Sequence, residues 1–241
     1  HLHTDCNVVA NTTWFVKNQA IKGDGAGVYA GVQSHLLVAG GAEFAFNTGG
    51  NQGGAVYIGL RSVLRAESGV RLVGNTAASG GGVYASTEGT LHLSDGVEFV
   101  SNDARLNGGG VHLDAGASLY AANVSWTEHH AENGAALWAC RDCLVHLFGR
   151  IVIAWNRAEG NGGGIAAAQL LLEGSVVFSF NEASVGGAVH MGADGACMME
   201  ARHAVVFNAN MATDGAALFA ASCIIMFSDG GEFTNNTAHT K

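Results

Sequence analysis

The sequence lacks proline entirely and contains few basic residues. Average usage near 5% would give about a dozen prolines in a chain of this length. Because proline cannot donate a backbone hydrogen bond, it is kept out of central β-strands, and its absence suits a chain that is hydrogen bonded throughout. The 11 Lys plus Arg residues face 20 Asp plus Glu residues, which gives a net charge of −9. This balance argues against binding to a nucleic-acid backbone, which needs a basic stripe.

Long apolar runs are also missing, since no stretch of 18 apolar residues occurs. The sequence therefore predicts no transmembrane helix. It begins at His1, and no basic segment with an apolar stretch precedes the first repeat. We expect residues 1–241 to form a single domain that is a fragment of a longer or processed chain.

What the sequence has is a phrase repeated nine times: an apolar residue, two spacers and then, in eight of nine copies, Asn. The last residue of the phrase recurs at intervals of 25 to 29 residues, at positions 18, 47, 75, 102, 129, 156, 181, 210 and 236. A period this regular along the whole chain predicts a solenoid, in which each repeat buries its apolar face on its neighbours.

Each repeat contains three short runs with alternating apolar residues, separated by Gly and small polar residues. In one copy these runs are 83–85, 91–93 and 97–99. A period of two is typical of strands, and a Gly triplet at the centre of the repeat disfavours helix. The sequence thus predicts an all-β fold, a parallel β-helix of about eight to nine coils of about 27 residues.

A second phrase precedes the first run of each repeat: two or three small residues, beginning with Gly, and then Val, Leu or Ile. Examples are Gly53-Gly54-Ala55-Val56 and the three glycines before Val83. Together with Phe-x-x-Asn, this phrase resembles the polymorphic outer membrane protein repeat, known from chlamydial-type adhesin passengers and related surface proteins. The resemblance covers essentially the whole chain and implies a right-handed parallel β-helix.

Stacked coils turn each repeat position into a column with rungs about 4.8 Å apart. We expect the Asn column to form a structural ladder through its side-chain amides, with His129 replacing one member. Its members are Asn18, Asn47, Asn75, Asn102, Asn156, Asn181, Asn210 and Asn236.

A second column, the ring column, lies one position after the apolar residue that follows the Gly phrase. Its neighbours on both sides belong to the inward apolar series, so the period of two places this column outside. Stacked rings can simply stabilise adjacent coils, or an exposed stripe of rings can bind another chain or a glycan. The ring-bearing members are Tyr29, Tyr57, Tyr84, His112, Trp138, His190 and Phe219, and Ala166 interrupts the series.

Four of the five cysteines fit two disulfides. Cys197 and Cys223 occupy the same position in successive coils, which puts their Cα atoms within disulfide range. Cys140 and Cys143 flank a turn and could close a small loop. Buried free thiols are the alternative, and a lone Cys-x-x-Cys is weak support for zinc. Cys6 is left over.

Three positions, Asn11, Asn123 and Asn235, fit the N-glycosylation sequon. Sequons and disulfides together favour an extracellular or cell-surface location. We therefore expect a disulfide-bonded glycoprotein.

No catalytic, cofactor-binding or metal-binding residues are predicted. A polysaccharide lyase on this fold needs clustered acids with calcium and a basic residue. Here the chain has three lysines, and many of its acids lie beside glycines in turns or precede a Phe. His129-His130 is the most unusual local pair, and a tolerated polar substitution is favoured over a metal role. The acids considered are Asp95, Asp114, Asp194, Asp229, Glu43, Glu98 and Glu232.

The favoured function is a non-catalytic structural or adhesive scaffold, a segment of a surface adhesin or of a filament or sheath. Its partners would be other protein chains or flanking domains stacked on the open ends, where strand edges lack a partner. The alternative is a carbohydrate-binding or carbohydrate-cleaving β-helix that uses the ring column. Nucleic acid is not expected as a partner, and no cofactor is expected.

Overall fold

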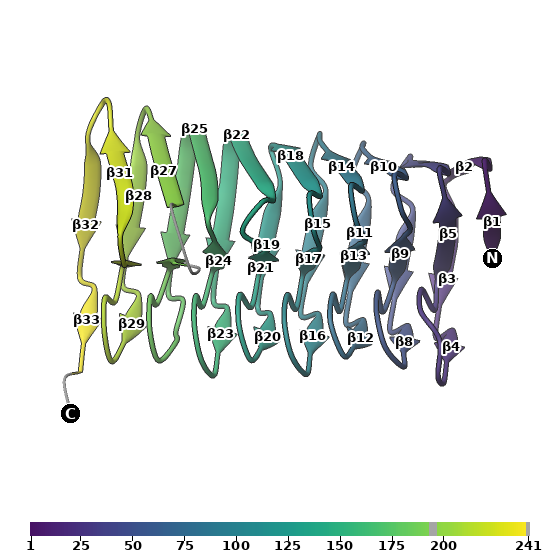
Figure 1. Cartoon of the computed structure of the whole chain (residues 1–241), viewed down its shortest axis with the longest axis horizontal. Coiled ribbons are helices and arrows are strands. Elements are labelled where there is room, and N and C mark those ends of the chain that lie inside the picture. Colours follow the sequence, from purple (N-terminus) through teal and green to yellow (C-terminus); the bar gives the residue numbers. More distant parts are fainter. Residues whose placement is uncertain (193–196, 240–241) are drawn as a thin grey trace.

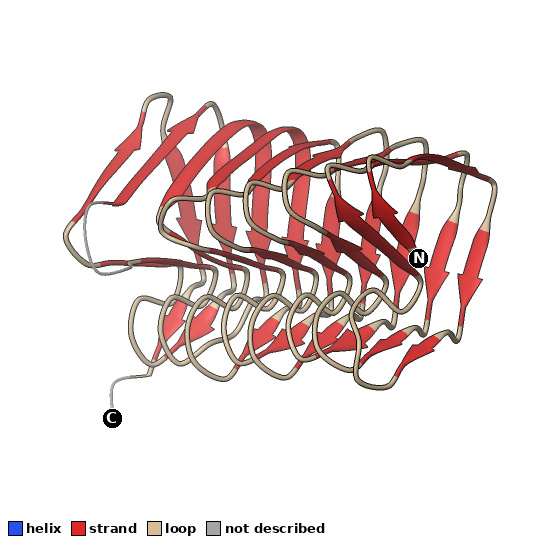
Figure 2. Ribbon diagram, turned by 45° about the vertical axis from the view of Figure 1, so that its right-hand side comes forward, coloured by secondary structure: helices blue, strands red, loops and turns tan. Residues whose placement is uncertain are grey.

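The computed structural model describes residues 1–192 and 197–239, and Asp194 lies outside them. The described chain is all-β: parallel strands wind into a β-solenoid of nine coils, with the coils stacked along the long axis (Figures 1 and 2). This confirms the predicted parallel β-helix and its period.

Each coil begins with a strand of sheet A, which follows the Gly phrase in every coil after the first. All neighbouring strands in this nine-stranded sheet are parallel. The strands are β1 (Leu2–Thr4), β5 (Val28–Val32), β9 (Val56–Ile58), β13 (Val83–Ala85), β17 (Val111–Leu113), β21 (Leu137–Ala139), β24 (Ile165–Ala167), β26 (Val189–Met191) and β30 (Leu218–Ala220).

Sheet B has two arms, because most coils turn between a first and a second strand. The first arm contains β2 (Asn7–Asn11), β6 (His35–Ala39), β10 (Val63–Ala66), β14 (Thr90–Leu93), β18 (Ser118–Ala122), β27 (Cys197–Arg202) and β31 (Cys223–Phe227). The second arm contains β3 (Trp14–Val16), β7 (Glu43–Ala45), β11 (Arg71–Val73), β15 (Glu98–Val100), β19 (Ser125–Thr127), β28 (Val205–Asn208) and β32 (Gly231–Thr234). Two long strands, β22 (Leu144–Ala154) and β25 (Gln169–Ser179), run through both arms.

A fourth, two-residue strand follows the Asn of most coils, which the sequence did not predict. Each is too short to show an alternating pattern by itself. They are β4 (Gln19–Ala20), β8 (Thr48–Gly49), β12 (Thr76–Ala77), β16 (Asp103–Ala104), β20 (His130–Ala131), β23 (Arg157–Ala158), β29 (Met211–Ala212) and β33 (Thr237–Ala238). Single-residue bridges from Glu182 to Arg157 and Met211 continue this row between β23 and β29.

The core is a column of apolar side chains that runs along the axis of the solenoid. In one coil, Leu91, Leu93, Val97 and Phe99 are all buried. Rings of the Phe-x-x-Asn phrase stack on one another from coil to coil, with centroids 5.0 Å apart for Phe178 and Phe207. Burying apolar surface in this way is the main favourable contribution to folding.

The Gly phrase supplies the turn into sheet A. Gly80 has φ +63°, and a Cβ built there would lie 2.6 Å from the carbonyl oxygen of Val83. A side chain is therefore opposed both by the left-handed backbone and by the close approach of the next strand. This explains why the first residue of the phrase is Gly in every copy.

The predicted Asn ladder is confirmed by its hydrogen bonds. The backbone N–H and the Nδ2 of Asn75 both donate to Oδ1 of Asn102, each at 2.9 Å. The same Nδ2 also donates to the carbonyl oxygen of Phe44 at 2.9 Å. Since each buried ladder Asn satisfies turn groups of two coils, the column belongs to the scaffold.

His129 takes an Asn position in this ladder but reproduces only part of its bonding. Its Nδ1 accepts from the backbone N–H of Asn102 at 3.0 Å, and its own N–H donates to Oδ1 of Asn156 at 3.0 Å. Its Nε2 is buried with no hydrogen-bond partner in the described structure. Burial lowers the pKa of His129 to about 3, so the ring is neutral at ordinary pH.

Candidate functional site

The ring column stacks as expected. Ring centroids lie 4.8 Å apart for Tyr29 and Tyr57, 4.5 Å for Tyr84 and His112, and 4.4 Å for His112 and Trp138. These spacings match favourable aromatic stacking, so the column links one coil to the next.

The column is not a continuous exposed stripe, which differs from the expectation. Tyr84 and His112 are only 4% and 6% exposed, while the ring-bearing members on either side are half-buried. The reason is that Tyr84 and His112 are each stacked on both faces by rings of adjacent coils. An outward direction in the strand therefore does not guarantee contact with solvent.

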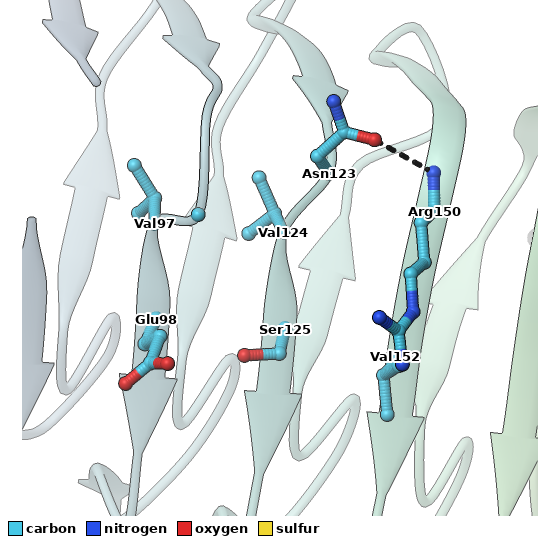
Figure 3. A pocket seen from close by; sticks show the side chains of 8 residues that line it. Val97, Glu98, Asn123, Val124, Ser125, Arg150 and Val152 are labelled. Carbon is cyan, nitrogen blue, oxygen red and sulfur yellow. Dashed lines mark hydrogen bonds between the residues drawn. The ribbon is translucent and has the colours of Figure 1, made fainter. Parts of the chain in front are cut away.

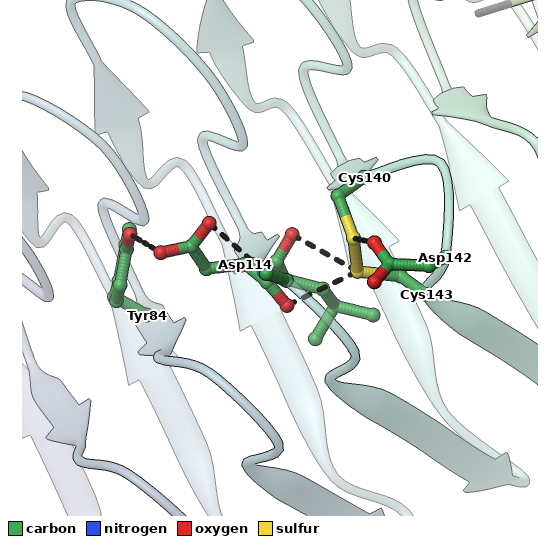
Figure 4. Close-up of a disulfide and its surroundings, with 7 residues drawn as sticks. Tyr84, Asp114, Cys140, Asp142 and Cys143 are labelled. Carbon is green, nitrogen blue, oxygen red and sulfur yellow. Dashed lines mark hydrogen bonds between the residues drawn. A yellow bond between two sulfur atoms is a disulfide. The ribbon is translucent and has the colours of Figure 1, made fainter.

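The buried centre of the column includes a polar anchor. The hydroxyl of Tyr84 donates to Oδ2 of Asp114 at 2.9 Å (Figure 4). Burial, followed by this carboxylate, raises the pKa of Tyr84. Burial lowers the pKa of His112 to about 4, and its Nδ1 is buried with no partner in the described structure.

The column breaks at Ala166, and a hollow of about 340 Å³ lies at the break. It is lined by Trp138 and His190, by Ala166 between them and by a rim that includes Asn133, Asn161 and Arg141. The hollow thus combines two ring-bearing members of the predicted stripe with amide and guanidinium groups.

Both predicted disulfides are present. Cys197 and Cys223 are register partners in β27 and β31, with Cα atoms 4.6 Å apart. Cys140 and Cys143 close a four-residue loop, with Cα atoms 5.1 Å apart (Figure 4). Cys6 is a free, partly buried thiol.

Asp142 lies beside the Cys140–Cys143 bridge, with Oδ1 3.0 Å from Sγ of Cys140. The three side chains form a compact group that resembles a metal-binding cluster. Because metals are bound by thiolates and both sulfurs here are oxidised, the cysteines of this group do not offer metal ligands.

A polar cluster on the outer face of β22, β25 and β27 was not anticipated. Nε2 of His146 lies 2.8 Å from Oε2 of Glu173, whose other oxygen lies 2.6 Å from Nη1 of Arg202. Nε of Arg202 is 2.7 Å from Oε1 of Glu200. The hydrogen bond from His146 and then the contact with Arg202 lower the pKa of Glu173.

This polar cluster brings together groups that sequence spacing kept apart. Arg202 contacts both carboxylates, and the lowered pKa of Glu173 makes this residue unsuitable as a proton donor near neutral pH. Glu173 can orient the His146 ring, as a carboxylate orients a general base. Strand register could have revealed the cluster, since His146 pairs with Leu171, two residues before Glu173 on the same face, and Glu173 pairs with Arg202.

A second feature missed by the sequence reasoning is a pair of exposed rings. Trp155 and Phe180 stack with centroids 4.1 Å apart, and they are 59% and 43% exposed. Both occupy the position before a ladder residue and have positive φ, at 60° and 56°. Bulky residues are uncommon in this conformation, and the pair marks an outward apolar surface.

The acids considered from sequence are distributed along the outer faces. Glu43 and Glu98 flank Arg71 in one column, with Nε of Arg71 3.2 Å from Glu98 and Nη1 4.0 Å from Glu43. The cation between them separates the two carboxylates. His130 is partly exposed, with Nδ1 3.6 Å from Oδ2 of Asp103 and Nε2 3.9 Å from Oε1 of Glu159.

All three sequon asparagines, Asn11, Asn123 and Asn235, have exposed side chains. Oδ1 of Asn123 accepts from the backbone N–H of Arg150 at 3.0 Å, at the edge of a shallow hollow of about 460 Å³ (Figure 3). This exposure suits glycan attachment, which stays a prediction.

Comparisons with known proteins return no match among protein-family models, curated proteins or solved structures. The resemblance to the polymorphic outer membrane protein repeat therefore stays a prediction based on the two phrases. Among the described residues, no helix is long and apolar enough to cross a membrane.

Proposed function

We propose that this chain is a rigid structural rod of an extracellular or cell-surface protein, which works through protein–protein contacts rather than catalysis. One observation carries this proposal: each major class of side-chain interaction joins one coil to the next. The Asn ladder, the stacked rings and the Cys197–Cys223 disulfide all run along the axis.

Charged side chains follow the same direction. Arg61 lies 2.6 Å from Glu88 of the next coil, and Arg157 lies 3.6 Å from Glu182 of the next. Such exposed pairs contribute only about 0 to 1 kcal/mol each. Their shared direction nevertheless supports the proposal, because these ion pairs also join each coil to the next and help to keep the strands in register.

The coils at each end supply the contact surfaces in this proposal. At one end Trp14 is 64% exposed and Ile21 83% exposed, and at the other Ile224 is 62% exposed and Phe233 48% exposed. Strands β1 to β4 and β30 to β33 each have a neighbour on one side only within the described chain. Further parallel coils, from flanking sequence or from another chain, would cover these edges.

The Asn ladder is complementary at its two ends. Asn18 donates to Oδ1 of Asn47, and no ladder Asn precedes it in the described chain to donate to its own Oδ1. Oδ1 of Asn236 accepts from Asn210, and no ladder Oδ1 follows it in the described chain. A second copy stacked head to tail would place Asn18 Oδ1 where the N–H of Asn236 needs an acceptor. Phe15 and Phe233 stack on Phe44 and Phe207, and their rings could continue this stack into a second copy in the same way.

The polar cluster provides the test of the non-catalytic part of the proposal. Purified chain is incubated with a panel of polysaccharides, and new reducing ends and unsaturated products are measured. We expect no turnover above that of buffer. Cleavage that disappears in Glu173→Gln or His146→Gln would show that the chain is an enzyme and would contradict the non-catalytic proposal.

A further inference from the structure

The interruption of the ring column leaves two ring faces without a stacking partner. In register, Ala166 pairs with Trp138 of β21 on one side and with His190 of β26 on the other. Trp138 stacks on His112 at 4.4 Å, and His190 stacks on Phe219 at 5.3 Å. The remaining face of each ring lies on the side of Ala166, where the column has only a methyl group.

The width of this gap favours one type of guest. Neighbouring strands lie about 4.8 Å apart, so side chains two strands apart are separated by about 9.6 Å. Carbon atoms in contact lie about 3.5 to 4.0 Å apart, so a flat aromatic guest fills only about 7 to 8 Å. A pyranose ring is thicker, because axial hydrogens project from both of its faces.

Polar groups surround the gap. Nδ2 of Asn133 donates to Oδ1 of Asn107 at 3.1 Å, and Oδ1 of Asn133 accepts from the backbone N–H of Asn161 at 3.0 Å. Arg141 is exposed at the rim, inside the small loop closed by the Cys140–Cys143 disulfide. Amides both donate and accept, and guanidinium groups donate, which suits the hydroxyls at the edge of a sugar ring.

The chemistry of the walls agrees with the width. The faces of aromatic rings carry negative charge density and attract the weakly positive C–H groups of a sugar. The hollow of about 340 Å³ lies at the lower end of the range for small-molecule sites, about 300 to 1,000 Å³. Its size therefore suits one ring of a longer chain.

We propose that the gap at Ala166 binds one pyranose residue of a glycan, held between Trp138 and His190 with its hydroxyls at Asn133, Asn161 and Arg141. The site gives the rod a carbohydrate ligand and does not depend on whether its ends stack. A neutral sugar would use the amides and Arg141 as hydroxyl partners, and a uronate would add an ion pair with Arg141.

Isothermal titration of the purified chain tests this site with three probes: cellohexaose, chitohexaose and hexagalacturonate. Ala166→Phe adds a ring where other members of the column have one, and so fills the gap without breaking the pattern. Trp138→Ala removes one wall. Tyr29→Ala is the matched control, because it removes a ring from the same column far from the gap.

We expect saturable binding of at least one probe by the parent chain. Trp138→Ala should weaken it by up to about tenfold, since one ring contact contributes up to about 1.5 kcal/mol. Ala166→Phe occupies the gap itself and should weaken binding by more than Trp138→Ala. Tyr29→Ala should stay within about twofold of the parent. Preference for hexagalacturonate, lost in Arg141→Gln, would identify the uronate form.

Two outcomes would overturn the assignment to a sugar. The first concerns the oligosaccharide titrations. It is met if none of the three probes shows saturable binding, or if binding is unchanged in both Ala166→Phe and the smaller filling variant Ala166→Leu. The other is tighter binding of a flat aromatic probe, indole-3-acetate, than of every oligosaccharide. Thermal melting of each variant establishes that it is folded before titration, and Ala166→Leu serves if Ala166→Phe is not.

Discussion

Replacement of His129 by Asn should remove a specific part of the acid sensitivity of this protein. The ladder site buries the imidazole completely and lowers its pKa to about 3, whereas an unfolded histidine titrates near 6.5. Between these two pH values the unfolded chain binds a proton that the folded chain does not. Folding is therefore penalised as the pH falls below about 6.5, and the penalty grows until about pH 3.

The size of the effect follows from the distance to pH 6.5. At pH 5 the difference is about 1.5 pKa units, and each unit corresponds to about 1.36 kcal/mol, so His129 costs about 2 kcal/mol relative to pH 7.5. In His129→Asn this term is absent. His112, whose pKa is about 4, contributes a similar acid-sensitive term, but it is present in both proteins and cancels in the comparison.

Asn at this position should also stabilise the chain at neutral pH. It offers an acceptor to Nδ2 of Asn102, which now bonds only Leu72, and it removes the orphaned Nε2 of His129. Each restored hydrogen bond contributes about 1 kcal/mol net. The smaller side chain leaves a void near Gly110, which offsets about 1 kcal/mol of this gain in stability. A net gain of about 1 to 2 kcal/mol is expected at pH 7.5.

The assay is urea unfolding followed by tryptophan fluorescence at pH 7.5 and pH 5 for the parent and for His129→Asn. His35→Asn is the matched control, since His35 is exposed at the start of β6. The parent and the control should each lose about 2 kcal/mol more than His129→Asn between the two pH values. Equal losses in all three proteins would refute the reasoning about the buried imidazole.

Three further tests probe the scaffold by thermal unfolding. Asn75→Ala removes two side-chain donor bonds and leaves the donors of the preceding ladder Asn without an acceptor, so a loss of about 3 to 5 kcal/mol is expected; a loss below about 1 kcal/mol would show that water replaces the ladder. Cys197→Ser with Cys223→Ser opens a link between residues 26 apart and should cost about 3 kcal/mol under oxidising conditions, with no difference from the parent after reduction. Gly80→Ala, which meets both positive φ and a nearby carbonyl, should destabilise more than Gly96→Ala, which has positive φ but open space; equal effects would mean that close approach is unimportant.

The repeated positions were predictable because they do the same physical task in every coil. The Asn ladder, the turn glycines and the register of Cys197 with Cys223 all follow from a period that puts equivalent residues on adjacent rungs. Backbone hydrogen bonding and close approach at turns impose the same residue type each time. A single sequence therefore contains many independent copies of the same signal.

Features that occur once were harder to predict. The polar cluster joins His146, Glu173 and Arg202 from three coils. His92 lies in the same column as His146, but Tyr120 separates the two, and Glu173 and Arg202 each follow a different residue type in their own column. The exposed pair Trp155 and Phe180 occupies a position that varies freely from coil to coil. Such sites become visible only when strand register places the individual side chains beside one another.

The alternating pattern also could not predict which outward side chains are buried. The period of two correctly predicts that Tyr84 and His112 point away from the axis, but stacking on both faces removes them from solvent. Exposure depends on the size of the neighbours in adjacent coils. At Ala166 a small residue interrupts the column and a hollow lies beside it, although Ala166 itself is only 6% exposed.

The most direct test of the rod proposal is the length of single particles in electron micrographs as a function of protein concentration. We predict rods that lengthen in whole multiples of one chain as concentration rises. Charge placed on the apolar end, in Phe233→Lys, should return the particles to single length, whereas Trp155→Lys on the side should not. One particle length at every concentration, with or without native flanking sequence, would contradict assembly through stacked coils.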